Sequence, residues 1–231
     1  MKDFAKLVLP LVIAGLPIAT SFAAPIDDAL AAASSFRDGG DSAPLKSIET
    51  EVVAALGNPA ARAEIETKLL AALPSASNRR ATDFLCRMLR IVGTDRSIPA
   101  LEKLLGEAET SHPARYAVAS IGTGAAGAAL QRALGEVPVT LKSGIVDSLG
   151  ELRYKPATSE IIKLLETEHC GDSAARALGL IGGTQASGPL AARLGEVEGT
   201  SRDIVFNALL RLSLIHISEP TRLWSGSRMP S

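Results

Sequence analysis

The sequence predicts an all-α protein, an α-solenoid built of stacked helical hairpins, and three observations support this prediction. Hydrophobic residues make up 46% of the chain but aromatic residues only 3%, and Ala, Leu and Gly dominate. Ala and Leu are strong helix formers, and Gly commonly ends a helix. Similar apolar segments recur about every thirty residues, which is typical of repeat proteins. Few segments alternate apolar with polar residues, and this disfavours sandwiches and barrels.

Residues 1–23 are expected to be a secretory signal peptide. Two lysines precede an apolar run over residues 7–19, and Ser21 and Ala23 place small side chains at the −3 and −1 positions of a cleavage site. A membrane anchor is the alternative, but two prolines interrupt a run already shorter than the roughly 20 residues that span a bilayer. We therefore expect export to the periplasm or the extracellular space, without stable membrane insertion after cleavage.

Residues 24–43 are expected to form a short helix and then a polar, Gly-rich linker, and residues 44–211 are expected to form the repeat domain.

Within the repeat domain, four segments align without gaps: residues 89–105, 118–134, 149–165 and 178–194. Each has a branched apolar residue at its fourth position, here called the anchor: Val92, Ile121, Leu152 and Ile181. Apolar residues recur nine positions after each anchor, as Leu101, Leu130, Ile161 and Leu190. Four aligned units argue against coincidence.

Each repeat predicts a helical hairpin. A first helix ends at a turn near the anchor, which contains Gly in most units, and a second helix follows with its Leu residues three and four apart on one face. Such a pair cannot bury its own apolar stripe, but stacked neighbours form a continuous core. A degenerate unit over residues 48–73 is expected to be the first, cap-side hairpin.

The recurrent patterns A-L-G-x-I-G and P/A-x-L-x-x-x-L resemble the HEAT repeat family, in particular its short bacterial variants of the phycobilisome-lyase type. The resemblance covers residues 44–211, and the period is shorter than the roughly 40–47 residues of ordinary HEAT repeats. The resemblance implies a solenoid that binds other macromolecules and seldom acts as an enzyme. The fold alone does not identify its function.

No catalytic, cofactor or metal site is expected from the sequence. Cys86 and Cys170 fall in different units and are interpreted as small buried hydrophobes. His169 next to Cys170, with Glu166 and Glu168 just before, has no second cluster to complete three or four metal ligands. The chain is therefore expected not to be an enzyme. Its net charge of −1 gives no reason to expect a nucleic-acid partner.

A basic residue recurs at an equivalent position of the second helices, and this set is the candidate binding site for a protein or peptide: Lys68, Lys103, Arg132 and Lys163. In a solenoid, equivalent positions form a ladder along one face, which is suited to an acidic partner. The alternative is an ordinary solvated face, because acidic neighbours such as Glu102 and Glu160 accompany these cations.

Residues 212–231 match none of the repeats. LSLIHISEPTR, which starts at Leu212, and the closing SRMPS both resemble translated sequencing-library adapter, in the correct order and frame. The repeat is therefore expected to be truncated near Arg211, with the tail non-native and apolar surface open at that end.

These observations favour an exported, non-catalytic scaffold that binds a protein partner through the exposed face of its second helices. An alternative is the regulatory or spacer region of a longer exported enzyme whose catalytic or cofactor domain is missing. A chromophore lyase shares the fold resemblance, but an export signal argues against pigment assembly in the cytoplasm.

Overall fold

The computed structural model describes residues 26–218, which are all-helical apart from turns and short connections. The expected signal peptide and most of the tail lie outside these residues. Its α-helices are α1 (Ile26–Ser34), α2 (Ala43–Ala55), α3 (Pro59–Ala72), α4 (Arg79–Val92), α5 (Ile98–Glu102), α6 (Ala108–Ile121), α7 (Gly124–Glu136), α8 (Val139–Glu151), α9 (Thr158–Lys163), α10 (Gly171–Ile181), α11 (Ser187–Leu194) and α12 (Gly199–Ser218).

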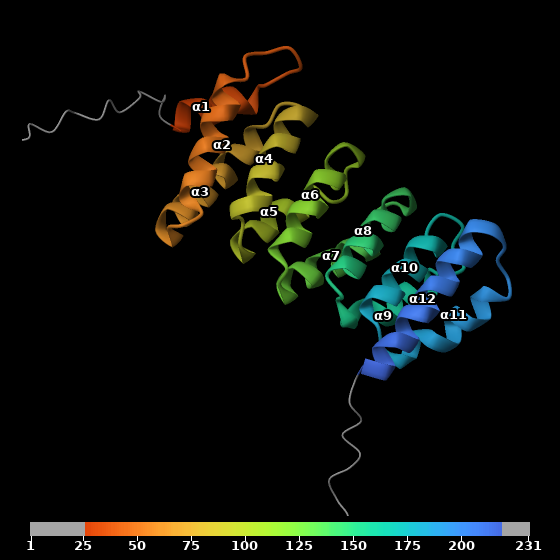
Figure 1. Cartoon of the computed structure of the whole chain (residues 1–231). Coiled ribbons are helices and arrows are strands. Elements are labelled where there is room, and N and C mark those ends of the chain that lie inside the picture. The colour runs from red at the N-terminus through yellow and green to blue at the C-terminus, as the bar shows by residue number, and fades with distance from the viewer. Residues whose placement is uncertain (1–25, 219–231) are drawn as a thin grey trace, which may run out of the picture.

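The helices are arranged in two layers. The first helices α4, α6, α8, α10 and α12 pack on one another in succession, while the second helices α5, α7, α9 and α11 lie between them in sequence and form the other layer. Figure 1 shows the elements following one another from α1 to α12, so that the two ends of the described chain lie at opposite ends of the array. The predicted all-α, solenoid-like fold is confirmed.

The expected hairpins are present as α4 with α5, α6 with α7, α8 with α9, and α10 with α11, and the degenerate unit is α2 with α3. The apolar residues nine positions after the anchors have no exposed surface: Leu101, Leu130, Ile161 and Leu190. The period of the sequence therefore reflects one buried stripe that runs through the whole stack.

Two second helices are shorter than the sequence suggests. α5 ends at Glu102 and α9 at Lys163, yet Leu105 and Leu165 just beyond them are still buried. The Leu105 amide donates to the Glu102 carbonyl at 3.1 Å, three residues back, and the turn after α9 is bonded in the same way. This spacing is that of a 3-10 turn, which tightens a helix end and keeps the Leu side chains in the core.

Small residues set the contact between successive first helices. A Cβ atom on Gly150 of α8 would lie 2.7 Å from the Ala177 Cα of α10. A Cβ atom on Gly179 of α10 would lie 2.8 Å from the Ala208 Cα of α12. Each glycine stands two residues before its anchor, so the same position serves the same close approach in two repeats.

The segment expected as a short helix and linker contributes to the core. α1 buries Leu30 and Ala33 and packs against α2 and α3. The Ser77 amide donates to the Ser34 carbonyl at 2.9 Å, which fixes the C-terminal end of α1 against the start of the next hairpin. α1 thus covers the N-terminal end of the array, and only the residues between α1 and α2 act as a linker.

The last helix runs past the expected repeat boundary. α12 extends to Ser218, and Leu212, the residue equivalent to the anchors, is 2% exposed. The helix continues past this position, where the other repeats have a turn. Leu212 therefore belongs to the core, whereas Ser213 and Leu214 are exposed.

Deletion of residues 213–231 is expected to leave the helical circular dichroism per residue and the melting temperature nearly unchanged, because Ser213 and Leu214 are exposed. Deletion from Leu212 instead should lower the melting temperature, since it removes a buried leucine. Equal melting temperatures for the two truncations would contradict the placement of Leu212 in the core.

Gly179→Ala is expected to lower the free energy of unfolding by about 1–3 kcal/mol, because the added methyl group overpacks the α10–α12 contact. Gly188→Ala in α11 is the matched control, since nothing lies within 4 Å of a Cβ atom there. Helix propensity alone makes that change neutral or stabilising. Urea denaturation of both variants measures the difference, and equal stabilities would contradict the close approach.

Candidate protein-binding surface

The structure places the four cations of the expected ladder in two different situations. The Lys68 ammonium lies 3.2 Å from Asp27 of α1 and 3.6 Å from Glu64. Arg132 donates two hydrogen bonds of 2.9 Å to the two carboxylate oxygens of Glu102, one repeat earlier. The hydrogen bond that Lys68 donates to Asp27 raises the pKa of Lys68, and those that Arg132 donates to Glu102 raise the pKa of Arg132. Both cations are therefore already partnered within the chain.

Lys103 and Lys163 are exposed, and neither forms an ion pair with the residues that the structure describes. Along the ladder, exposed lysines therefore alternate with cations whose charge is neutralised by a neighbouring carboxylate. The role of the ladder as a binding stripe remains a prediction.

α4 is strongly basic, with four arginines and one aspartate. Three of its guanidinium groups have acidic partners: Arg79 with Glu109 at 3.2 Å, Arg80 with Asp38 at 2.9 Å and Arg87 with Asp83 at 3.5 Å. Arg90 is exposed, and no carboxylate of the described chain pairs with it. In a chain of net charge −1, this is a local concentration of positive charge.

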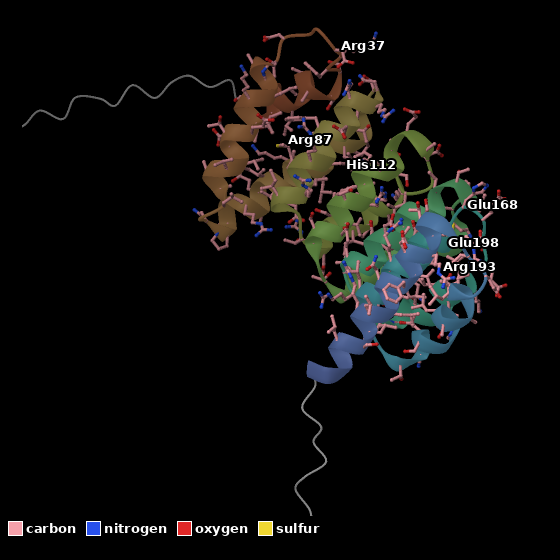
Figure 2. All side chains as sticks on the ribbon, turned by 45° about the vertical axis from the view of Figure 1, so that its right-hand side comes forward. Arg37, Arg87, His112, Glu168, Arg193 and Glu198 are labelled. Atoms are coloured by element: carbon pink, nitrogen blue, oxygen red, sulfur yellow. The ribbon has the colours of Figure 1, made fainter. Side chains whose placement is uncertain are left out.

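A pocket of about 170 Å³ lies between α4 and α6, here called the α4–α6 pocket. Side chains from both helices line it, including Asp83, Arg87, Arg90, His112, Pro113 and Tyr116. Figure 2 labels Arg87 and His112, which come from these two neighbouring helices. The Arg87 guanidinium also lies over the Phe84 ring, 5.6 Å from its centroid. One wall of the pocket is therefore cationic, and the other carries two aromatic rings.

Arg115 fixes the aromatic wall from behind. Its guanidinium donates to the Gly144 carbonyl of α8 at 3.1 Å and to His112 Nδ1 at 3.0 Å. It also lies over the Tyr116 ring, 4.9 Å from the centroid. Because a guanidinium only donates, His112 Nδ1 is the acceptor and the ring proton is on Nε2. His112 and Tyr116 stack with centroids 4.8 Å apart, so both rings are held before any ligand arrives.

A glycine stands behind this wall. A Cβ atom on Gly144 would lie 2.8 Å from the Arg115 Nε. The guanidinium therefore rests directly on the backbone of α8. Like Arg90, Arg115 has no carboxylate partner within residues 26–218, and its positive charge is held in place by neutral acceptors.

The residues that line the pocket share a register that sequence reasoning missed. Asp83, Arg87 and Arg90 stand nine, five and two positions before the anchor of their repeat, and His112 and Tyr116 stand nine and five before theirs. This spacing of four and then three places side chains on one helical face. The sequence signal, an exposed face of the first helices rich in Arg, was available in RRATDFLCRMLR.

A second groove opens on first helices at the other end of the array. It has a volume of about 650 Å³ between α10 and α12, and its lining includes Arg176, Leu180, Ile204, Leu210, Arg211 and Leu214. Arg176 stands five positions before its anchor, as Arg87 and Tyr116 do. Both hollows therefore lie on the outer face of the first helices rather than on the second-helix face.

The buried carboxylate of Glu66 has a structural use. It accepts hydrogen bonds from the Thr94 amide at 2.7 Å, the Thr94 hydroxyl at 2.9 Å and the Ser97 hydroxyl at 2.6 Å. Arg62, one turn earlier on α3, donates to the Val92 carbonyl at 2.9 Å. These bonds tie α3 to the turn between α4 and α5, and they occupy the carboxylate of Glu66.

Over residues 26–218, no three His, Cys, Asp or Glu side chains gather closely enough to hold a metal ion. The same part of the chain contains no helix long and apolar enough to cross a membrane. His169 is exposed and Cys170 is buried at the start of α10.

Comparison with known proteins gives no further assignment: no protein-family model matches this chain, and no curated protein matches it significantly.

The two thiols are expected to be unreactive in the folded protein. Burial raises the pKa of Cys86 to about 12 and also raises that of Cys170. At pH 8 a disulfide reagent such as Ellman's reagent should therefore label neither thiol until denaturant is added, since the thiolate is the nucleophile. Because the folded pKa of Cys86 lies above the unfolded one, its effect on stability is a loss as pH rises from about 9 towards 12. Rapid labelling of Cys86 at pH 8 without denaturant would contradict its burial.

Proposed function

We propose that this protein is an exported, HEAT-like scaffold that binds a protein partner through the outer face of its first helices. The observation that carries the proposal is the α4–α6 pocket, where unpartnered Arg90 faces a preorganised pair of aromatic rings. Arginine and tyrosine are, with tryptophan, the residue types enriched at the hot spots of protein interfaces. A wall already fixed by Arg115 loses little side-chain entropy on binding.

The repeat architecture supports a scaffold rather than an enzyme. Each hairpin contacts mainly its neighbours and presents its outer residues at a regular spacing, which suits an extended partner. The signal-like N-terminus supports export, and the repeat patterns support the HEAT-like assignment. The first-helix face is favoured over the second-helix ladder because its pocket combines Arg90 with two fixed rings, whereas two of the four ladder cations, Lys68 and Arg132, are neutralised by their own carboxylates.

A photo-crosslinking amino acid at position 116 is expected to give a discrete, light-dependent adduct with one partner protein in the native host, because Tyr116 lines the pocket. The same amino acid at position 163, on the second-helix face, is the matched control and should give none. Mass spectrometry of the adduct identifies the partner. Adducts at 163 alone would move the binding surface to the ladder, and their absence at both positions would argue against a scaffold.

A further inference from the structure

We propose that the α4–α6 pocket recognises a carboxylate side chain on an acidic segment of the partner protein. This inference rests on the proposed function and names the chemistry of the partner at the same site. It starts from the charge of the pocket, where Arg87 and Arg90 form one wall and Asp83 supplies the only carboxylate that lines it.

The two arginines differ in what they have left to offer. Arg87 is already paired, because its guanidinium Nε lies 3.5 Å from a carboxylate oxygen of Asp83 on the same helix. Arg90, one turn further along α4, is exposed and pairs with no carboxylate of the described residues. A guanidinium presents a planar fork of donors that fits a carboxylate with two parallel hydrogen bonds. Arg90 is therefore the group that would receive the ligand.

The opposite wall complements the same ligand. With His112 Nδ1 occupied by Arg115, its Nε2 proton is the one left to donate. The Arg115 charge lies behind the Tyr116 ring and has no acid within the described chain to neutralise it. A carboxylate in the pocket would therefore meet positive charge on one side and a neutral donor with a fixed cation behind it on the other.

The surroundings favour a carboxylate over a polyanion such as nucleic acid. Asp83 lies in the pocket itself, Glu109 of α6 and Asp147 of α8 lie on flanking first-helix positions, and Glu151 is exposed at the end of α8. A phosphate backbone needs basic side chains along an extended track. Around the pocket, carboxylates alternate with the basic side chains instead, which suits a single acidic side chain or a short acidic run.

The apolar part of the pocket sets a further requirement. Pro113 and the rings of His112 and Tyr116 offer apolar and aromatic surface next to the guanidinium groups. A peptide that carries an aromatic or aliphatic residue beside its carboxylate would bury more surface than a purely acidic one. The partner segment is thus acidic with an apolar neighbour rather than uniformly charged.

The test measures the fluorescence anisotropy of two labelled peptides, one of repeated Glu-Phe and one of repeated Gln-Phe, with the full chain at about 0.15 M ionic strength, where distant charges are screened. Arg90→Glu is expected to weaken binding of the Glu-Phe peptide by about tenfold or more, the equivalent of losing one good charged contact. Arg202→Glu is the matched control, because it makes the same charge change at an exposed arginine of α12, outside both the α4–α6 pocket and the ladder. It should weaken binding by less than about twofold, as expected for a distant, screened charge.

Equal weakening by the two variants would overturn the proposal, because it would show a response to net charge alone. Equal binding of the Glu-Phe and Gln-Phe peptides would also overturn it, as would tighter binding of an oligothymidine probe, which would indicate a nucleic-acid surface. Circular dichroism and melting temperature confirm that both variants fold. If position 116 cross-links to a partner but no acidic peptide binds, the scaffold function stands and the carboxylate inference fails.

Arg90→Lys separates geometry from charge. It keeps the positive charge but loses the planar fork, so an intermediate loss of peptide binding is expected. Affinity equal to that of the unmodified protein would contradict recognition by paired hydrogen bonds from Arg90.

Discussion

The close approach of successive first helices is the constraint on which the rest of this structure depends. Gly150 lies against Ala177, and Gly179 lies against Ala208, at distances that leave no room for a Cβ atom. One hairpin cannot bury its own apolar stripe, so each repeat relies on its neighbour for a core. With so few aromatic residues, the core is filled by Leu, Ile, Val and Ala at short spacing instead of by large rings.

The α4–α6 pocket is a local departure from this packing rule. Two residues before the anchor, the later repeats have buried Gly150 and Gly179, whereas the earlier repeat has Arg90. Its long side chain reaches the surface and lines the pocket, while the helices continue to pack. The position two residues before the anchor packs neighbouring helices together in the later repeats, whereas on α4 it carries a surface side chain that is available to contact a ligand. Other contacts along α4 hold α4 and α6 together.

The sequence was sufficient for the architecture because burial repeats with the period of the chain. The anchor Val92 and the later Leu101 and Leu130 are buried where the alignment expects them. Their hairpins follow from that pattern and from the turns between the helices. The 3-10 ends after α5 and α9 were not predicted, since their Leu residues keep the helical spacing while the backbone tightens. The inclusion of α1 in the core also depends on distant contacts that a local pattern does not contain.

The candidate site was less predictable, because the state of a charge depends on what lies opposite it in the neighbouring repeat. Lys68, Lys103, Arg132 and Lys163 are equivalent in sequence. Lys68 meets Asp27 of α1, and Arg132 meets Glu102 of the preceding repeat, so equivalence in sequence does not give equivalent availability. For Arg90, the sequence shows that its helix is rich in arginine. Only the arrangement of the helices shows that no carboxylate of the described residues pairs with it.

Support from both sides explains why this pocket is a property of the stack and not of one hairpin. Arg115 holds the aromatic wall through the Gly144 carbonyl of the following repeat. Glu66 and Arg62 of the preceding repeat bind the turn that ends α4. A side chain that is already fixed gives up less entropy when a ligand binds, and that fixing comes from neighbours outside the pocket. The proposed binding at the α4–α6 pocket would therefore depend on intact repeats on either side, and damage to a distant stacking contact would reach the site through these same bonds.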